Sequence, residues 1–172
     1  MPDLYVSWTE YYQKIDNLAV QIYQSQWQFN QIVCLAKGGL RIGDILCRIY
    51  GKPLAILSTA SYGGKNYQTR GKIQISEHLA MIGSSLGNPI LLVDDLVDSG
   101  ISLQEATQWL QKYNNQAILE IRSAVLWYKS CSVVKPDYYV EYLEDNPWIH
   151  QPFEYYEQIT IEELAKDFNH YH

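Results

Sequence analysis

The chain has 172 residues, of which 47% are hydrophobic and 19% charged, and this composition suits one globular domain with a sizeable core. Its formal net charge of −6 argues against a nucleic-acid-binding protein, because such proteins rely on a basic face. No apolar run approaches the roughly 18 residues of a membrane span, and the start, MPDLYVSWTE, lacks the pattern of a signal peptide. We therefore expect a cytoplasmic protein without an integral membrane segment.

The first expected element is a helix that begins at a capping box, with Ser7 at the N-cap and Glu10 at the N3 position. The apolar residues that recur behind this box at helical spacing are Tyr11, Ile15, Leu18, Ala19, Ile22 and Tyr23. A short run rich in β-forming residues then predicts a buried strand at 31–36. The glycine pair 38–39 ends this strand, and a helix at 40–50 follows it.

Strands and helices continue to alternate along the rest of the chain. The further expected elements are strands at 53–60, 90–93, 117–127 and 138–142, a short return strand at 73–75, and helices from about 102 to 113 and at 160–168. The segment 61–72, SYGGKNYQTRGK, has three glycines, three basic residues and no apolar stripe, which predicts a mobile loop. The alternation predicts an α/β fold with a mainly parallel sheet and right-handed crossovers.

Polar segments follow three of these strands. Ligands of parallel sheets bind beyond the carboxyl ends of the strands. The turn at Lys37, the loop 61–72 and the segment 94–102 all occupy such positions. We therefore expect these three segments to share one rim of the sheet.

The stretch ILLVDDLVDSGISL carries the chemistry at that rim. A strand, a turn with Gly100 and the start of a helix would present free backbone N–H groups, and Ser99 and Ser102 add hydroxyl donors. This pattern indicates a site for a phosphate monoester. The alternative is that Asp98 or Ser99 only caps the helix.

Asp94 and Asp95 end the strand as two adjacent carboxylates, which repel each other and are costly to remove from water. A cation or a pair of sugar hydroxyls would relieve that cost. A diol beside a phosphate site indicates a ribose phosphate. An exposed Asp-Asp turn without a ligand is the alternative.

At these residues the sequence resembles a known family. LLVDDLVDSGIS is similar to the phosphoribosyl pyrophosphate motif of type I phosphoribosyltransferases. More narrowly, the chain resembles the bacterial xanthine–guanine and hypoxanthine phosphoribosyltransferases over roughly residues 5–154. The matching pieces, in family order, are YVSW, LAKGGLRIGDIL, the Ser61-Tyr62 pair, WYKS and NPWIHQPFE.

The resemblance implies a type I phosphoribosyltransferase-like twisted, mainly parallel sheet flanked by helices, with a small hood over the base site. It implies one domain over 1–172, with a core at about 28–127. The hood would comprise about 128–155 and the N-terminal segment. The tail 155–172 has no counterpart in the resemblance.

The resemblance also implies which residues bind phosphoribosyl pyrophosphate. Asp94 and Asp95 would hold the ribose hydroxyls, directly or through Mg²⁺. The residues implied for the 5′-phosphate are Ser99, Gly100, Ile101 and Ser102, and those implied for the pyrophosphate are Lys37 and Gly38. Ser61 and Tyr62 would begin a loop that closes over the transition state, for which an ordinary hairpin loop is the alternative.

The base-binding residues follow from the same resemblance. Asp98 would act as the proton acceptor near purine N7, Trp148 would stack on the base, and the backbone of Ile149 would meet the 2-position of the ring. Lys129 would donate to the purine O6. An ammonium donates and cannot accept, so it suits a 6-oxopurine and leaves adenine, which offers a donor there, unpaired. A solvated lysine and a packing tryptophan are the alternatives.

Some positions depart from the family pattern. Lys37 stands where the similar proteins usually have Arg, which removes a bidentate phosphate contact. Ile101 replaces a common Gly in the phosphate loop, where its backbone N–H must still reach the phosphate. The cysteines, three in number and without a CxxC pair, suit a reducing compartment and are expected to be small buried residues.

The sequence therefore predicts a magnesium-dependent purine phosphoribosyltransferase of purine salvage, acting on hypoxanthine, guanine or xanthine and forming a nucleoside 5′-monophosphate and pyrophosphate. The chain has enough aromatic residues to form a subunit interface as well as a core, so we expect a homo-oligomer, either a dimer or a tetramer. Three alternatives stay open: a regulator on the same fold that binds nucleotide or RNA, a phosphoribosyltransferase for another base, and a non-catalytic nucleotide-binding domain.

Overall fold

The computed structural model describes residues 3–61, 73–113, 117 and 120–168. The described elements are β1 (Leu4–Tyr5), α1 (Trp8–Gln24), β2 (Gln31–Ala36), α2 (Leu40–Tyr50), β3 (Leu54–Ser61), β4 (Ile73–Ile75), β5 (Ile90–Val93), β6 (Leu96–Val97), α3 (Ile101–Lys112), β7 (Ile121–Lys129), β8 (Tyr138–Leu143), β9 (Ile149–His150), α4 (Tyr155–Gln158) and α5 (Ile161–Phe168). They form two compact units, one of residues 14–146 and one of the segments on either side.

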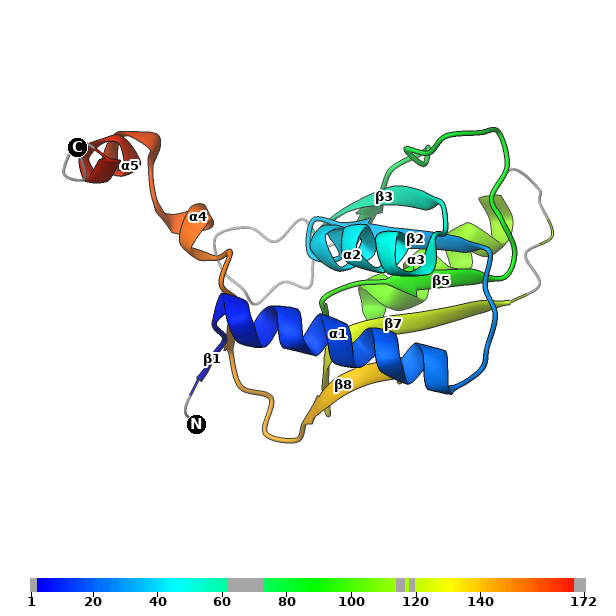
Figure 1. Cartoon of the computed structure of the whole chain (residues 1–172), viewed down its shortest axis with the longest axis horizontal. Helices are drawn as coiled ribbons and strands as arrows, with labels where there is room; N and C mark the ends of the chain where they lie inside the picture. The colour runs from blue at the N-terminus through cyan, green and yellow to red at the C-terminus, as the bar shows by residue number, and fades with distance from the viewer. Residues whose placement is uncertain (1–2, 62–72, 114–116, 118–119, 169–172) are drawn as a thin grey trace. The chain divides into compact units, whose positions relative to one another are not determined.

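The larger unit is built on one sheet, labelled in Figure 1, with the strand order β4-β3-β2-β5-β7-β6 and with β8 paired to β7. All neighbouring strands run parallel except β4, which is antiparallel to β3. The predicted α/β fold with a mainly parallel sheet is confirmed. The residues of β2 and β5 are almost all buried, as expected for central strands covered on both faces.

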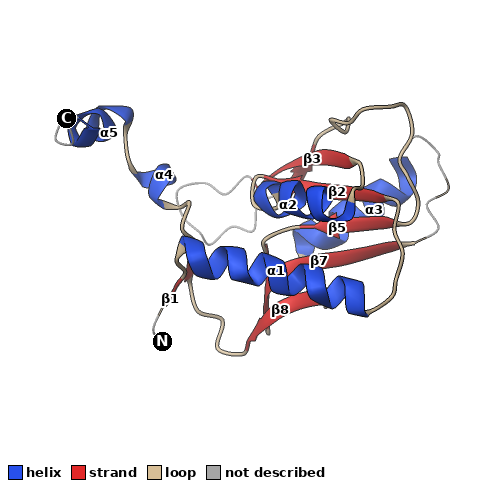
Figure 2. Cartoon of the chain, in the orientation of Figure 1, coloured by secondary structure: helices blue, strands red, loops and turns tan. Residues whose placement is uncertain are grey.

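Helices cover both faces of this sheet, as the colouring by secondary structure in Figure 2 makes clear. From the central pair β2 and β5, the crossover through α2 leads to β3, and the crossover through α3 leads to β7 in the opposite direction. Crossovers between parallel strands of one sheet are right-handed in nearly all proteins, so two crossovers in opposite directions place α2 and α3 on opposite faces. Lys14 of α1 forms an ion pair of 2.6 Å with Glu141 of β8, which ties α1 to the far side of the sheet from β3.

Most predicted elements lie within one or two residues of their observed bounds. The clearest difference is the strand expected at 117–127, which begins at Ile121 and continues to Lys129. It is longer at its carboxyl end because β6 and β8 both pair with residues 127–128. Among the apolar positions predicted for α1, only Tyr23 is exposed, by 77%, although its neighbour Ile22 is fully buried.

The smaller unit contains the parallel pair of β1 and β9, with Leu4 opposite Ile149. The capping box at the start of α1 is observed: the Ser7 N–H donates to Glu10 Oε2 at 2.8 Å and the Glu10 N–H donates to Ser7 Oγ at 3.2 Å. An equivalent box precedes α5, between Thr160 and Glu163. Within the described part of the chain, none of the helices has both the length and the apolar character that crossing a membrane requires.

Candidate active site

The acidic segment lies at an interruption in a strand. Both β5 and β6 pair with β7, and Asp94 and Asp95 stand between them. The carbonyl of Asp95 accepts hydrogen bonds from the backbone N–H groups of Leu126 and Trp127, at 3.0 and 3.2 Å. The backbone is therefore held on both sides of the interruption, and the two carboxylates are fixed at the carboxyl edge of the sheet.

The carboxyl of Asp94 is electrostatically unfavourable in its ionised form. Loss of hydration inside the fold raises its pKa well above the ordinary value, and the charge of the adjacent Asp95 raises it further. Hydrogen bonds from the backbone N–H groups of Asp95, at 3.0 Å, and of Gly39 act in the opposite direction without cancelling the effect. A cation or hydroxyl donors at this point would stabilise the ionised pair.

The turn after β2 packs directly against this acidic pair. A Cβ atom placed on Gly38 would lie 2.6 Å from Cγ of Asp95, and one placed on Gly39 would lie 3.1 Å from Cα of Asp94. Only residues without a side chain fit at such distances. The structure thus brings Lys37 and Gly38, which were expected to bind pyrophosphate, to the carboxylates expected to hold the ribose; the Ala36–Lys37 peptide is cis.

The next segment forms the start of α3. Gly100 has a φ of 82° and stands immediately before the helix. The first-turn N–H groups that follow it have no carbonyl partner within the helix. The Ile101 N–H lies within the same loop, 3.5 Å from Ser99 Oγ. The acidic pair and this loop line one hollow of about 140 Å³, whose lining residues include Asp94, Asp95, Asp98, Ser99, Gly100 and Ser102.

The chain after β7 braces this loop from behind. The Val133 N–H donates to the Ser99 carbonyl at 3.0 Å. A Cβ atom on Gly100 would collide with Ser132 Oγ. Ser132 is itself fixed, because its hydroxyl donates to the Val134 carbonyl at 2.7 Å. The shape of the loop therefore depends on residues about 30 positions further along the chain, which the sequence analysis did not identify.

Asp98 and Lys129 meet beside the hollow. Nζ of Lys129 lies 3.6 Å from Oδ1 of Asp98, although the lysine side chain is only 7% exposed and the aspartate side chain is 60% exposed. A lysine at the end of a buried strand differs from the solvated surface lysine that was the alternative. The arrangement places a fixed ammonium and an accessible carboxylate side by side, so one ligand ring could contact both.

Cys131 is a neighbour of Asp98 that the sequence analysis assigned to the buried residues. It is exposed, and its thiol lies 3.4 Å from Oδ1 of Asp98. Burial and then the Asp98 carboxylate raise the pKa of this thiol. The sequence offered one sign that Cys131 lies near the site, namely its position two residues after Lys129. The expectation of small buried cysteines is correct for Cys34 and wrong for Cys131.

The remaining predicted site residues are Ser61, Tyr62, Trp148 and Ile149. Ser61 ends β3, and Tyr62 lies outside the described residues. Trp148, which is 54% exposed, and Ile149, which is buried, belong to the smaller unit. The roles of these four residues stay predictions.

The donor set available for a metal ion is small. Among the residues that the structure describes, no group of three or more His, Cys, Asp and Glu side chains could hold an ion. The Asp94–Asp95 pair offers oxygen ligands of the kind that Mg²⁺ prefers, and Mg²⁺ commonly keeps several waters and binds substrate phosphates. This pair fits an ion that arrives with a phosphorylated substrate better than a permanently caged one.

Comparisons with known proteins identify the family and the fold of the chain. The family model for the phosphoribosyl transferase domain matches residues 7–158. The chain is 28% identical over 150 residues to the xanthine-guanine phosphoribosyltransferase of Gluconobacter oxydans, covering 87% of this chain and 83% of that protein. The structure resembles a purine phosphoribosyltransferase from Pyrococcus horikoshii, with a TM-score of 0.71 and 27% identity over 89% of this chain and 94% of the other. Its fold also matches a Helicobacter pylori xanthine-guanine-hypoxanthine phosphoribosyltransferase, with a TM-score of 0.71 and 22% identity over 96% and 99% of the two chains.

Proposed function

The chain belongs to the type I phosphoribosyltransferase family, and from this premise we propose that it transfers the phosphoribosyl group of phosphoribosyl pyrophosphate to a 6-oxopurine. The products would be a nucleoside 5′-monophosphate and pyrophosphate, and the role would be purine salvage. The observation that carries this proposal is the Lys129–Asp98 pair at 3.6 Å, beside the acidic pair and the loop at the start of α3. The names of the similar proteins, which include xanthine, guanine and hypoxanthine as bases, support the same substrate class.

The proposed base recognition rests on opposite hydrogen-bonding roles. The Lys129 ammonium can only donate, so it would pair with the O6 acceptor of a 6-oxopurine. The Asp98 carboxylate would accept the proton from the ring at N7 as the new glycosidic bond forms. Adenine would place an amino donor against the ammonium of Lys129, which is only 7% exposed, and would leave both donors unpaired, which disfavours adenine.

The proposed phosphoribosyl site uses the carboxyl edge of the sheet. Ser99, Gly100, Ile101 and Ser102 would hold the 5′-phosphate through backbone N–H and hydroxyl donors. Asp94 and Asp95 would hold the ribose hydroxyls, directly or through Mg²⁺, and Lys37 and Gly38 would hold the pyrophosphate. Bound Mg²⁺ would supply positive charge that stabilises the leaving pyrophosphate.

Three further assignments complete the proposal. Reaction through an oxocarbenium-like state requires the exclusion of water, so we propose that the loop beginning at Ser61 and Tyr62 closes over the substrates. Trp148 would stack on the base and the Ile149 backbone would contact its 2-position. The residues from about 128 to 155 and the N-terminal segment would form the hood of one phosphoribosyltransferase domain.

The test is an ultraviolet assay with Mg²⁺, phosphoribosyl pyrophosphate and each purine or pyrimidine base in turn. We expect conversion of at least one of hypoxanthine, guanine and xanthine and little conversion of adenine, uracil or orotate. Asp98→Asn should lower kcat by about 100-fold or more with KM largely unchanged. Lys129→Ala should impair use of the purine far more than binding of phosphoribosyl pyrophosphate.

The matched control is Asp44→Asn, which removes the same charge from an exposed carboxylate on α2, outside both the site and the proposed hood, and should leave turnover unchanged. Failure to convert any base would reject the enzyme and favour a nucleotide- or RNA-binding regulator on this fold. Preferential conversion of adenine or a pyrimidine would reject the role assigned to Lys129. Normal turnover of Asp98→Asn would remove Asp98 as the base.

A further inference from the structure

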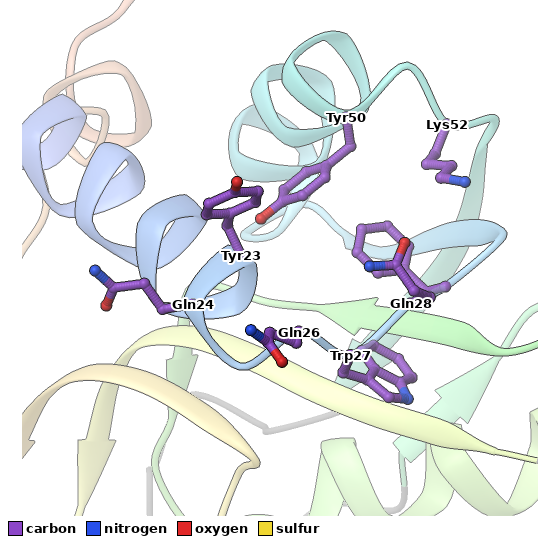
Figure 3. Close-up of a pocket in the computed structure, with 8 residues that line it drawn as sticks. Tyr23, Gln24, Gln26, Trp27, Gln28, Tyr50 and Lys52 are labelled. Atoms are coloured by element: carbon purple, nitrogen blue, oxygen red, sulfur yellow. The ribbon is translucent and has the colours of Figure 1, made fainter.

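A second concave site lies at the opposite end of the sheet from the acidic pair. It is a cavity of about 640 Å³ formed by the end of α1, the connection from α1 to β2, and residues 50 and 52 just before β3 (Figure 3). Because β2 and β3 run parallel, the residues that precede them share the amino edge of the sheet. The six residues of β2 separate this cavity from the Lys37 turn by about 20 Å. The site is therefore distinct from the candidate active site.

The wall of the cavity is aromatic and held in place. The rings of Trp27 and Phe29 stack with their centroids 5.5 Å apart, and Phe29 meets Tyr50 edge-on at 5.0 Å. The Tyr50 hydroxyl donates to the Ala19 carbonyl at 2.6 Å. Arg122 lies over the Trp27 ring at 4.7 Å. A wall fixed by so many contacts is preformed, which reduces the entropic cost of binding a ligand.

One aromatic ring in the cavity remains available for stacking. Tyr23 is 77% exposed although its position in the helical pattern predicts a core residue. Figure 3 shows its ring beside Tyr50, at the rim of the cavity. Among the described residues that line the cavity, Lys52 is the only charged one and no carboxylate is present. The lining thus combines aromatic faces with local positive charge in a protein whose net charge is −6.

Three glutamine side chains supply hydrogen-bonding groups at the same place. Gln24, Gln26 and Gln28 all line the cavity, and each amide offers both donors and an acceptor. Gln26 has a φ of 59°, an uncommon conformation for a residue with a side chain, and its N–H is held by the Tyr23 carbonyl at 3.1 Å. This held turn brings the three glutamines to the lining of one cavity, and such held outliers cluster at ligand sites.

We propose that this cavity binds a mononucleotide as a second ligand of the protein. The base would stack on Tyr23, the glutamine amides would pair with its polar edge, and Lys52 would contact the phosphate. The volume of this cavity lies within the range of about 300–1,000 Å³ that is typical of small-molecule sites. The cavity is therefore larger than a single aromatic ring requires. A hollow with a rigid wall and adaptable amides suits a small ligand. A protein partner would instead need a flatter surface patch.

The experiment separates this site from the one at the carboxyl edge. Ser99→Asp places a negative charge in the loop expected to hold the 5′-phosphate and so blocks nucleotide binding there. Titration calorimetry of the full chain carrying Ser99→Asp with GMP, AMP and UMP should show one remaining site per chain. Adding Lys52→Glu or Tyr23→Ala should each weaken that site by at least about tenfold. Adding Lys112→Glu, the same charge change at an exposed residue at the end of α3, should not alter it.

A second measurement uses the chain without substitutions in case a variant fails to fold. Fluorotryptophan NMR resolves the Trp27 signal, identified by its absence in Trp27→Phe, and GMP should shift that signal at saturation. No binding by Ser99→Asp together with an unmoved Trp27 signal would overturn the proposal. Residual binding that Lys52→Glu and Tyr23→Ala leave unchanged would also overturn it. So would self-association that Tyr23→Ala abolishes without any nucleotide binding, because the surface would then join two copies of the chain.

Discussion

Asp94→Asn should stabilise the ligand-free protein at neutral pH while impairing its proposed activity. The asparagine has the same shape and keeps an oxygen that can accept from the Gly39 and Asp95 N–H groups. It removes the negative charge that the fold disfavours, since loss of hydration and the Asp95 charge hold the pKa of Asp94 well above its ordinary value. Stability is thus given up at this position for a charge that the bound ribose or Mg²⁺ is proposed to need.

The sign of the pH dependence follows from that pKa. Where folding raises the pKa of a carboxyl, the folded state binds the proton more tightly than the unfolded state. The stabilisation is complete below the ordinary carboxyl pKa and is lost as the pH rises through the raised pKa of the folded state. The difference between Asp94→Asn and the unsubstituted protein should therefore be small in acid and largest at neutral pH.

The magnitude can be stated per unit of pKa elevation. Each unit corresponds to about 1.4 kcal/mol. For a chain of this size 1 kcal/mol shifts Tm by about 2–4 °C, so a gain in Tm of at least about 3 °C is expected at pH 7. Thermal unfolding followed by circular dichroism from pH 4 to 8, without Mg²⁺ or substrate, measures it. The control Asp16→Asn removes an exposed carboxylate on α1 and should change Tm little. A lower Tm for Asp94→Asn at pH 7, or a difference that does not vary with pH, would refute the reasoning.

Two further predictions concern the same edge of the sheet. Gly100→Ala should lower the free energy of unfolding in urea by about 1–3 kcal/mol, because the φ of Gly100 is 82° and the new Cβ would meet Ser132 Oγ. The control is Gly83→Ala, where φ is 103° and open space surrounds the new Cβ, so that only the backbone cost remains. Equal losses of unfolding free energy in the two variants would contradict the contribution of the Ser132 contact. Iodoacetamide at pH 8 should label the exposed Cys131 well before Cys34, because burial raises the pKa of the Cys34 thiol to about 12. Mass spectrometry measures the labelling rates of both cysteines. Comparable labelling of Cys34 in the native protein would contradict its burial.

Local sequence patterns were sufficient to predict the bounds of strands and helices whose residues carry a clear apolar pattern and clear end signals. The strand at 31–36 and the helix at 40–50 were predicted at their observed bounds, because an apolar run, a glycine pair and a helical stripe follow one another there. The parallel sheet followed from alternation, and with it the convergence of the Lys37 turn and the acidic segment at one edge. Chemistry placed at the ends of parallel strands can be predicted in this way, since topology alone brings those ends together.

Features that depend on contacts distant in sequence could not be predicted. The two-residue strand β6 exists because β7 offers it partners at Trp127 and Tyr128, and two residues carry no periodicity of their own. Tyr23 has the spacing of a core residue, but it is exposed while its neighbour Ile22 is fully buried, and which side of the helix the sheet covers depends on the tertiary packing. The exposure of Cys131 and its contact with Asp98 depend on how the chain turns after β7.

The brace behind the loop at the start of α3 gives this non-local dependence a direct test. The Val133 N–H donates to the Ser99 carbonyl at 3.0 Å, whereas its side chain is 70% exposed. Val133→Pro removes the donor, so the loop should lose part of its preorganisation for the 5′-phosphate. KM for phosphoribosyl pyrophosphate should rise by about three- to tenfold, the equivalent of one hydrogen bond, with a smaller change in KM for the purine. Val133→Ala keeps the N–H and should behave as the unsubstituted protein does. Equal KM values for phosphoribosyl pyrophosphate in the two variants would show that the loop holds its shape without the brace.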